Sequence, residues 1–421
     1  MNGIGTEKWA NFTVAIGPAA SLHTPRRRWP GSGAVQKARC QTARRRLGRR
    51  PRHTAAGQPP CSRRATLTGT PPRGRRAADG RVIFDAYEIR AWYASPYPLD
   101  EWEGAGPHTL WVCSGCFKYM QTPGAFLAHQ RRCTYTHPPG RKVYERGAHI
   151  IWEVDGAGAR LYAQNLCLFG KLFIDHKTIF FDVDPFQFYV LTDATSQYDH
   201  VLGFFSKERV SYDDYNLACI ITFPPYQKRG YGTLLIELSY YLSRTARVTG
   251  TPERPLSELG LKGYVSYWTA VVLRTLLAAF CGEDEQAQRI RAVLAGDAAS
   301  PWPDRERPQP VAKRRRGGWA GELPREAVAS REPAAAPREP AAAPQAPRAP
   351  TRISTTLGRV AAAAGLRPED ATLALANARL LAAAPRGAAG EPGFLVRRDA
   401  VETAARRCAL KPAILEEAYL L

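Results

Sequence analysis

Long apolar runs are missing from this 421-residue sequence. No stretch comes to the roughly eighteen apolar residues that a membrane-spanning helix needs, and no apolar core precedes a cleavage site near the N-terminus. The sequence therefore predicts a soluble protein that is not exported by the signal-peptide route and has no membrane partner.

Acidic residues are nearly absent from the first 80 positions. This stretch holds 17 Lys and Arg but only Glu7 and Asp79, so it supplies +15 of the formal net charge of +21. Its arginine runs lie among Gly, Pro, Ser and Thr, and such a composition cannot bury enough apolar surface to offset the entropy of ordering. Residues 1–80 are predicted to be a disordered Arg-rich tail, which either contacts nucleic-acid backbone nonspecifically or is solvated without a partner.

Cysteine is too scattered for a disulfide framework. Nine cysteines are spread over the chain, and only Cys113 and Cys116 form a CxxC pair. This usage suits a reducing compartment in which thiols bind metal or take part in catalysis. The run "KRRR" at 313–316 is a short signal of the nuclear-import type.

Composition divides the remainder into three parts. From Arg81 to about Ala279 aromatic and β-branched residues are dense, which indicates a folded core. Residues 285–350 are rich in Pro, Ala, Arg and Glu and contain the tandem repeat "REPAAAPREPAAAP", so they are predicted to form an extended linker. Helical spacing then returns, and residues 351–421 are predicted to form a small, mostly helical unit.

The folded core has the pattern of a mixed α/β domain. Apolar residues recur at helical spacing from Leu234 to Leu242. Upstream, four β-branched and aromatic runs separated by polar turns are predicted to be successive strands; they are "KTIFFDV", "FQFYVLTD", "HVLGFFSKERV" and "LACIITF".

One cluster has the spacing of a metal site. In "CSGCFKYMQTPGAFLAHQRRC", Cys113 and Cys116 are followed by His129 and Cys133. Three thiolates and an imidazole close a tetrahedral zinc shell with no position left for a substrate water, so the site is interpreted as structural zinc. The alternative is that the cysteines are buried small apolar residues. The following Gln130, Arg131 and Arg132 could face DNA, but a packing role for the finger is favoured.

A glycine-bearing turn precedes the predicted helix. "QKRGYGT", residues 227–233, lacks the Gly-Lys-Ser/Thr of a P-loop and the third glycine of a dinucleotide fingerprint. Gly230 and Gly232 would let backbone N–H groups approach a pyrophosphate at the positive end of the helix, with Lys228 and Arg229 adding charge. The alternative is a solvated basic turn that caps a surface helix.

The linked motifs of residues 84–280 resemble the MYST-type histone acetyltransferases. "YEIRAWYASPYP", the Cys-Cys-His-Cys finger, "QNLCLFGKLFIDHKT", "NLACIITFPPYQKRGYG", "GTPERPLSELG" and "YVSYW" occur in the order and spacing of that family. In "CLFGKLF", "LGFFSKERVSY" and "ITFPPYQKRGYG" the sequence looks most like the fungal silencing-associated branch.

The resemblance implies an acetyltransferase (GNAT-like) mixed sheet core with an N-terminal zinc finger and a C-terminal helical, helix-turn-helix-like unit, flanked by disordered segments. The zinc-finger part would span 81–150 and the acetyl-CoA-binding catalytic core 151–284. Carried over by motif, the residues that would hold acetyl-CoA are Ile220, Thr222, Gln227, Lys228, Arg229, Gly230, Tyr231, Gly232, Thr233, Ser257 and Ser266. The family usually has Lys where Thr233 stands, so cofactor affinity is expected to be lower.

Three further residues take roles from the resemblance. A lysine acceptor is almost all ammonium at neutral pH, so transfer needs a base, and Glu253 falls at the family's general-base position. Cys219 matches the active-site cysteine, which either forms an acetyl-cysteine or lines the pocket during direct transfer. Lys177 matches the autoacetylated lysine. Without the resemblance these would be an exposed loop carboxylate, a buried strand cysteine and an ordinary turn lysine.

The resemblance implies a nuclear enzyme that acetylates histone tails, with histone four favoured and nucleosomes as substrate. The Arg-rich tail would add nonspecific affinity for nucleosomal DNA, and the protein would belong to a chromatin-modifying complex. The alternatives are a chromatin-binding scaffold with little activity and an acetyltransferase for non-histone proteins or small amines.

Overall fold

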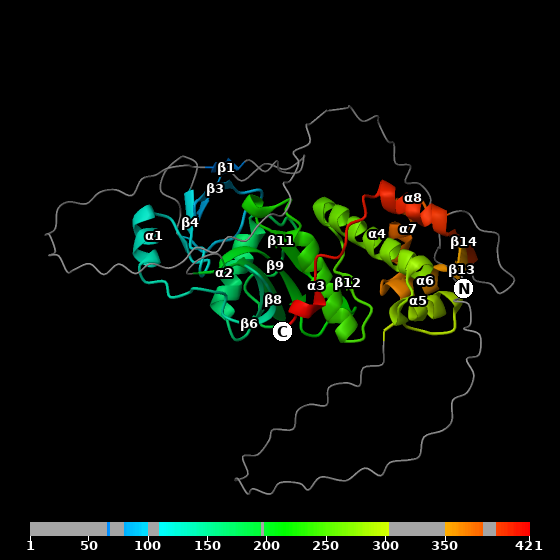
Figure 1. Ribbon diagram of the computed structural model, residues 1–421. Helices are drawn as coiled ribbons and strands as arrows, with labels where there is room; N and C mark the ends of the chain where they lie inside the picture. The colour runs from blue at the N-terminus through cyan, green and yellow to red at the C-terminus, as the bar shows by residue number, and fades with distance from the viewer. Residues whose placement is uncertain (1–64, 68–79, 100–108, 195–197, 303–349, 382–392) are drawn as a thin grey trace, which may run out of the picture. The chain divides into compact units, whose positions relative to one another are not determined.

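The computed structural model describes residues 65–67, 80–99, 109–194, 198–302, 350–381 and 393–421 (Figure 1). Nearly all of the predicted Arg-rich tail, the "KRRR" run and most of the predicted linker lie outside the described residues. Within the tail range, Ala65–Leu67 forms a short strand (β1) paired in parallel with β3 (Tyr87–Arg90), so the expectation of disorder does not hold for these three residues.

The N-terminal sheet carries the cysteine-rich hairpin. Its strand order is β1-β3-β2-β4-β5, and the helix α1 (Pro123–Gln130) follows β5. The remaining strands are β2 (Arg81–Phe84), β3 (Tyr87–Arg90), β4 (Thr109–Val112) and β5 (Tyr119–Met120). Phe84 stacks on Phe169 with ring centroids 4.6 Å apart, which joins this sheet to the main core.

A second, fully antiparallel sheet forms the centre of the core. Its order is β11-β9-β8-β7-β6, and the helices α2 (Arg160–Lys171) and α3 (Tyr231–Thr245) bury apolar side chains in the same cluster. The strands are β6 (Arg141–Arg146), β7 (His149–Asp155), β8 (Phe186–Asp193), β9 (His200–Glu208) and β11 (Cys219–Thr222).

This arrangement confirms the mixed α/β prediction and three of its four predicted strands, but the prediction for "KTIFFDV" is wrong. Residues 177–183 have no regular secondary structure. Ile179 and Phe181 are exposed, whereas Lys177 and Val183 are buried. The run therefore does not present one continuous apolar face to a sheet, which is what its composition suggested.

A short two-stranded ribbon brings Glu253 to the core. β10 (Tyr215–Leu217) pairs in parallel with β12 (Thr251–Pro252), and the backbone N–H of Glu253 donates to the carbonyl of Leu217 at 2.8 Å. The 3₁₀ turn Pro224–Tyr226 (η1) then connects β11 to the glycine-bearing loop before α3.

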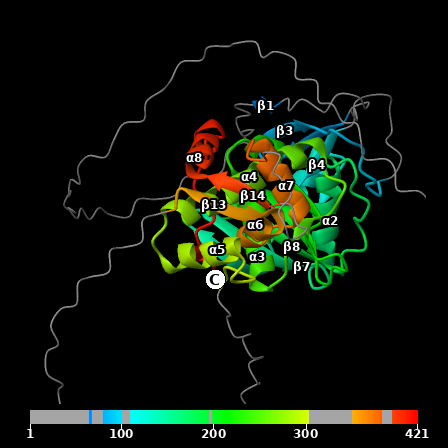
Figure 2. The same ribbon diagram turned by 90° about the vertical axis from the view of Figure 1, so that its right-hand side faces the viewer.

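In the last third of the described chain, helices surround α4 (Figure 1). Their buried side chains form a second apolar cluster. Figure 2 shows β13 and β14 side by side among the surrounding helices, and the two strands pair in antiparallel register. The elements are α4 (Glu258–Cys281), α5 (Glu285–Ala295), β13 (Arg352–Thr356), α6 (Leu357–Ala364), α7 (Pro368–Asn377), β14 (Gly393–Arg397), α8 (Arg398–Arg407) and η2 (Glu417–Tyr419).

Two expectations for this region need correction. The predicted linker 285–350 begins with a helix, because Asp284 accepts from the Ala287 N–H as N-cap and Ile290, Val293 and Leu294 are buried. The predicted helical unit 351–421 does contain helices, but the β13–β14 ribbon was not predicted.

The helix α4 also corrects the expectation that no stretch could cross a membrane. It is long and apolar enough to do so by length and composition. Half of its most apolar window is nevertheless buried inside the protein, and Trp268, Leu273 and Phe280 lie in the second apolar cluster. These contacts are those of a core helix.

The C-terminal segment is anchored to α3 by a buried carboxylate. One oxygen of Glu237 accepts the backbone N–H groups of both Ile414 and Leu415, each at 2.7 Å. Beyond them the N–H of Leu421 donates to the carbonyl of Val143 on β6. The end of the chain is therefore tied to α3 and to the central sheet.

Glu237→Gln is expected to lower the free energy of unfolding by about 1–2 kcal/mol, because hydrogen bonds to a charged acceptor are stronger than those to an amide. Urea denaturation measures the change. Glu417→Gln is the matched control, because Glu417 is exposed and lies 4.0 Å from Arg244. Equal stability of the two variants would show that Glu237 does not anchor the segment.

Candidate active site and zinc centre

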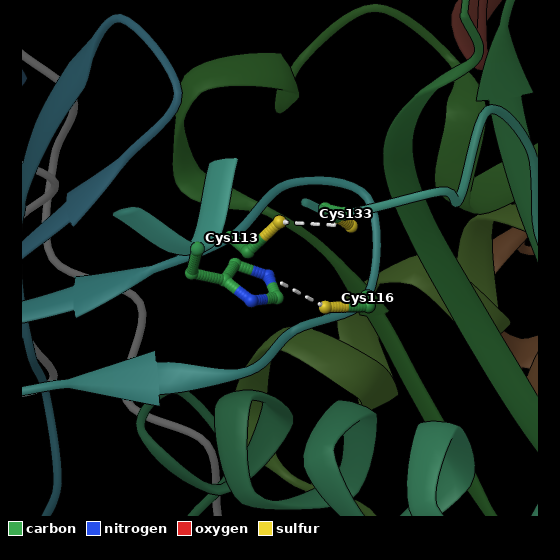
Figure 3. Close-up of side chains that lie close together, drawn as sticks. Cys113, Cys116 and Cys133 are labelled. Carbon is green, nitrogen blue, oxygen red and sulfur yellow. Dashed lines mark hydrogen bonds between the residues drawn. The ribbon is translucent and has the colours of Figure 1, made fainter. Parts of the chain in front are cut away.

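Three thiols and one imidazole converge beside the N-terminal sheet, as Figure 3 shows for the labelled cysteines. Their four ligand atoms all lie within 4.8 Å of one another. The sulfurs of Cys113 and Cys133 are 3.8 Å apart, and the Cys116 sulfur is 3.2 Å from His129 Nε2. Sulfurs bound tetrahedrally to zinc at about 2.3 Å would stand about 3.8 Å apart, so this donor set fits a structural zinc ion.

The local backbone places these ligands. Cys113 and Cys116 lie in the turn between β4 and β5, where Phe117 adopts a left-handed conformation with φ of 60°. A side chain at Gly115 would meet the Tyr135 carbonyl at 2.9 Å, so only glycine allows this close approach. Thr122 caps α1, whose last turn carries His129. Hydrogen bonding with Cys116 lowers the pKa of the Cys113 thiol below its ordinary value.

The glycine loop leaves the start of α3 open. Gly230 is its N-cap residue with φ of 89°, and among the described residues no side chain caps the first turn, which also contains no acid. The free backbone N–H groups at such an end attract an anion. Gln227 donates to the Thr222 carbonyl at 2.9 Å, which ties the loop to β11. Lys228 also has a positive φ of 63°.

Gly230→Ala is expected to raise the Kd for acetyl-CoA about 5- to 30-fold, because a left-handed conformation costs a non-glycine residue about 1–2 kcal/mol and the loop would relax away from it. The added carbon would also meet Ile414 Cδ1 at 3.3 Å. Isothermal titration measures the affinity.

The matched control is Gly147→Ala. Gly147 also has a positive φ, of 60°, but an added carbon there would meet nothing within 4 Å. This control should lose stability and keep its affinity for acetyl-CoA. Unchanged affinity in Gly230→Ala would contradict a role of the loop backbone in holding the pyrophosphate.

The Lys177 ammonium interacts electrostatically with Cys219, at the start of β11, and with Glu253, which directly follows β12. Cys219 is the first residue of β11, and its N–H donates to Ser206 Oγ at 3.2 Å. Lys177 is buried. Its local sequence alone had predicted an ordinary lysine in a turn, so this part of the prediction is wrong. The Glu253 side chain is exposed.

The charges of this cluster shift two pKa values. Burial acts to lower the pKa of Lys177, but Cys219, Cys167 and Glu253 outweigh it and the net shift is upward. Although the Glu253 side chain is exposed to solvent, the surrounding protein displaces part of the water around its carboxylate, and this desolvation raises its pKa. Glu208 raises the pKa further and Lys177 opposes the shift. A carboxylate with a raised pKa is a better proton acceptor, which is what a general base requires.

The other residues predicted to hold the cofactor lie on β11, around the start of α3, and on α4. Ile220 and Thr222 lie on β11, and Thr222 Oγ1 is 3.6 Å from where a side chain at Gly232 would begin. Tyr231 and Thr233 lie in the first turn of α3, with the Tyr231 hydroxyl 3.2 Å from His149 Nε2, and Arg229 precedes it. Ser257 instead caps α4 by accepting from the Gly260 N–H, and Ser266 is exposed further along α4.

Cys167 was not singled out from the sequence. It is buried on α2, and its thiol interacts with the Lys177 ammonium. Burial raises the pKa of the Cys167 thiol, and Lys177 acts against this shift. Ten positions of sequence separate the two residues, and only tertiary packing brings them together.

Two segments of the chain, one with the central sheet and one with the four zinc ligands, match known protein families. Residues 137–295 match the MOZ/SAS family, and residues 80–133 match the MYST family zinc finger domain. The two matched segments lie in the same order along the chain as the candidate zinc centre and the central sheet with its glycine loop. The MYST zinc finger ends at Cys133, the last of the four ligands.

Relatives of the MYST region are named histone acetyltransferases. The chain is 45% identical over 190 residues to the Tip60 homolog of Caenorhabditis elegans, which covers 45% of this chain and 41% of that protein. It is 45% identical over 195 residues to KAT6B of Homo sapiens, which covers 46% of this chain and 9% of that protein. The chain thus matches less than half the length of the first relative and about a tenth of the second.

Proposed function

We propose that this protein is a protein-lysine N-acetyltransferase that moves the acetyl group of acetyl-CoA to a lysine of a histone tail. The main support is that the strand β11 connects two features of the site. The open start of α3 follows this strand through the glycine loop, and Cys219 at its other end interacts with the Lys177 charge, which also acts on Glu253. The matches to the MOZ/SAS family and to the MYST family zinc finger domain support the same activity.

In the proposed reaction Glu253 takes a proton from the acceptor ammonium. The freed nitrogen lone pair attacks the thioester carbonyl carbon, a C–N bond forms, and the C–S bond breaks to release CoA thiolate, which then takes up a proton. Cys219 either lines the pocket or receives the acetyl group first. Cys219→Ala with near-normal turnover would exclude an obligatory acetyl-cysteine.

Lys177 is proposed as a site of autoacetylation. Its ammonium interacts with the thiols of Cys167 and Cys219, and acetylation would remove this buried charge. Mass spectrometry of active enzyme is expected to find acetyl-Lys177. Unmodified Lys177 in fully active enzyme would rule out a required modification.

Several finer assignments belong to the same proposal. They are a preference for histone four, nuclear localisation, membership of a chromatin-modifying complex, nonspecific DNA binding through the Arg-rich tail, and likeness to the fungal silencing-associated branch. The first is supported by the sequence resemblance, and the DNA contact by the +21 net charge.

A panel of acceptors tests the substrate class. Core histones, nucleosomes, an unrelated lysine-rich protein and free spermidine are offered with labelled acetyl-CoA, and modified lysines are located by mass spectrometry. Preferential labelling of histone four supports the proposal. Equal labelling of spermidine would favour a small-amine acetyltransferase, and acetyl-CoA binding without transfer to any acceptor would favour a scaffold.

A further inference from the structure

The C-terminal unit reaches the loop of Glu253 through one carboxylate. Asp370 lies in the first turn of α7 and its side chain is completely buried. It accepts from Thr251 Oγ1 at 2.8 Å and from the Arg254 guanidinium at 2.5 Å. These donors stand two residues before and one residue after Glu253, so a single side chain holds the loop on both sides of the proposed base.

The opposite side of the loop is fixed by the central core. β12 pairs with β10, and the Glu253 N–H donates to the Leu217 carbonyl at 2.8 Å. These backbone bonds set the position of the strand. The side chains of Thr251 and Arg254 turn away to Asp370 instead, which adds an attachment more than 100 residues further along the chain.

Burying a carboxylate between two parts of the fold costs desolvation free energy. Burial raises the pKa of Asp370, and Thr251 and Arg254 act in the opposite direction. An apolar contact of the same size often stabilises a protein as well as a buried ion pair does. The carboxylate of Asp370 differs from an apolar contact because it fixes an orientation. Its two oxygens accept from two donors on the loop, and these two hydrogen bonds together orient the loop.

We propose that Asp370 is a positioning residue for Glu253, so that the C-terminal unit completes the active site. The inference rests on the proposed function, in which Glu253 is the base. Asp370 lies outside residues 137–295, which match the MOZ/SAS family, and beyond the predicted linker. Docking of the C-terminal unit thereby becomes a condition for efficient proton removal.

The first test compares Asp370→Asn with Glu369→Gln, which removes an exposed carboxylate from the neighbouring position of the same helix. Asp370→Asn keeps the size of the side chain but not the charge that holds Arg254. Its kcat on a histone peptide is expected to fall about 10- to 100-fold, the scale of a small misplacement of a catalytic group. The Kd for acetyl-CoA should stay within about twofold in both variants.

A double mutant separates positioning from a general loss of structure. If Asp370 acts only through Glu253, adding Asp370→Asn to Glu253→Gln should lower the remaining activity no further. The loss of activity in each single variant, Asp370→Asn and Glu253→Gln, should become smaller as the pH approaches the acceptor pKa of about 10.4, because an unprotonated lysine needs no base. Multiplicative effects in the double mutant would overturn the inference.

Hydrogen exchange provides a readout independent of turnover. In Asp370→Asn the backbone amides of Thr251, Glu253, Arg254 and Leu256 should exchange faster than in the wild type and in Glu369→Gln. If the wild type transfers acetyl groups and Asp370→Asn matches Glu369→Gln in kcat and in amide exchange, the positioning role of Asp370 is wrong while the proposed function stands. If the wild type transfers to no acceptor, the proposed function fails, and the positioning role fails with it.

Discussion

Glu253→Gln is expected to lower kcat/KM for a lysine peptide about 100- to 10,000-fold near neutral pH, the range that a positioned general base contributes. An amide keeps the size of the side chain but cannot take the proton of the acceptor ammonium. The Kd for acetyl-CoA should not change, because the glycine loop and not Glu253 is proposed to hold the cofactor. Steady-state kinetics and titration calorimetry measure the two quantities.

The pH profile should distinguish the base from other causes. The pKa of Glu253 is raised, so wild-type kcat/KM should fall as the pH drops through a value above the ordinary one for glutamate, as the carboxylate becomes protonated. The variant should lack this limb, and its rate should rise toward the pKa of the acceptor lysine, about 10.4. Glu283→Gln removes an exposed carboxylate as a control. Wild-type rates in Glu253→Gln would exclude Glu253 as the base.

Cys116→Ser is expected to remove zinc and unfold the finger. Zinc contributes about 10–16 kcal/mol of apparent binding energy to small structural sites, and the cluster of Cys113, Cys116 and Met120 has few apolar neighbours of its own. The wild type should contain one zinc ion per chain, measured by elemental analysis. The variant should contain less than the wild type and unfold at a lower temperature.

Cys281→Ser is the matched control, because Cys281 is an exposed thiol. It should retain both zinc and thermal stability. A strong chelator should lower the unfolding temperature of the control and of the wild type to that of Cys116→Ser. Full zinc content in Cys116→Ser, or a chelator without effect, would contradict the zinc assignment.

The sequence was most informative where function depends on local spacing. The ligand set Cys113, Cys116, His129 and Cys133 was predicted from spacing alone, and the four ligand atoms do converge. The glycine loop was placed correctly before α3, because Gly230 takes the left-handed conformation that glycine allows. Three strands and a following helix were likewise recognisable from periodicity.

Features that depend on tertiary packing were not recognisable. The run 177–183 has strand composition, but its residues alternate irregularly between solvent and core. The helix α5 was missed because the Pro- and Ala-rich composition of the following residues concealed an N-cap and a buried face. Nothing in the local sequence indicates that Asp370 is buried, and its partners Thr251 and Arg254 are over 100 positions away.

Acetyl transfer from labelled acetyl-CoA to core histones by the purified full chain tests the central claim most directly. The wild type is expected to label histone lysines, and Glu253→Gln under the same conditions to leave them almost unlabelled while still binding acetyl-CoA. Binding of acetyl-CoA by both proteins with no transfer by the wild type, to histones or to nucleosomes, would contradict the claim that this site is an acetyltransferase.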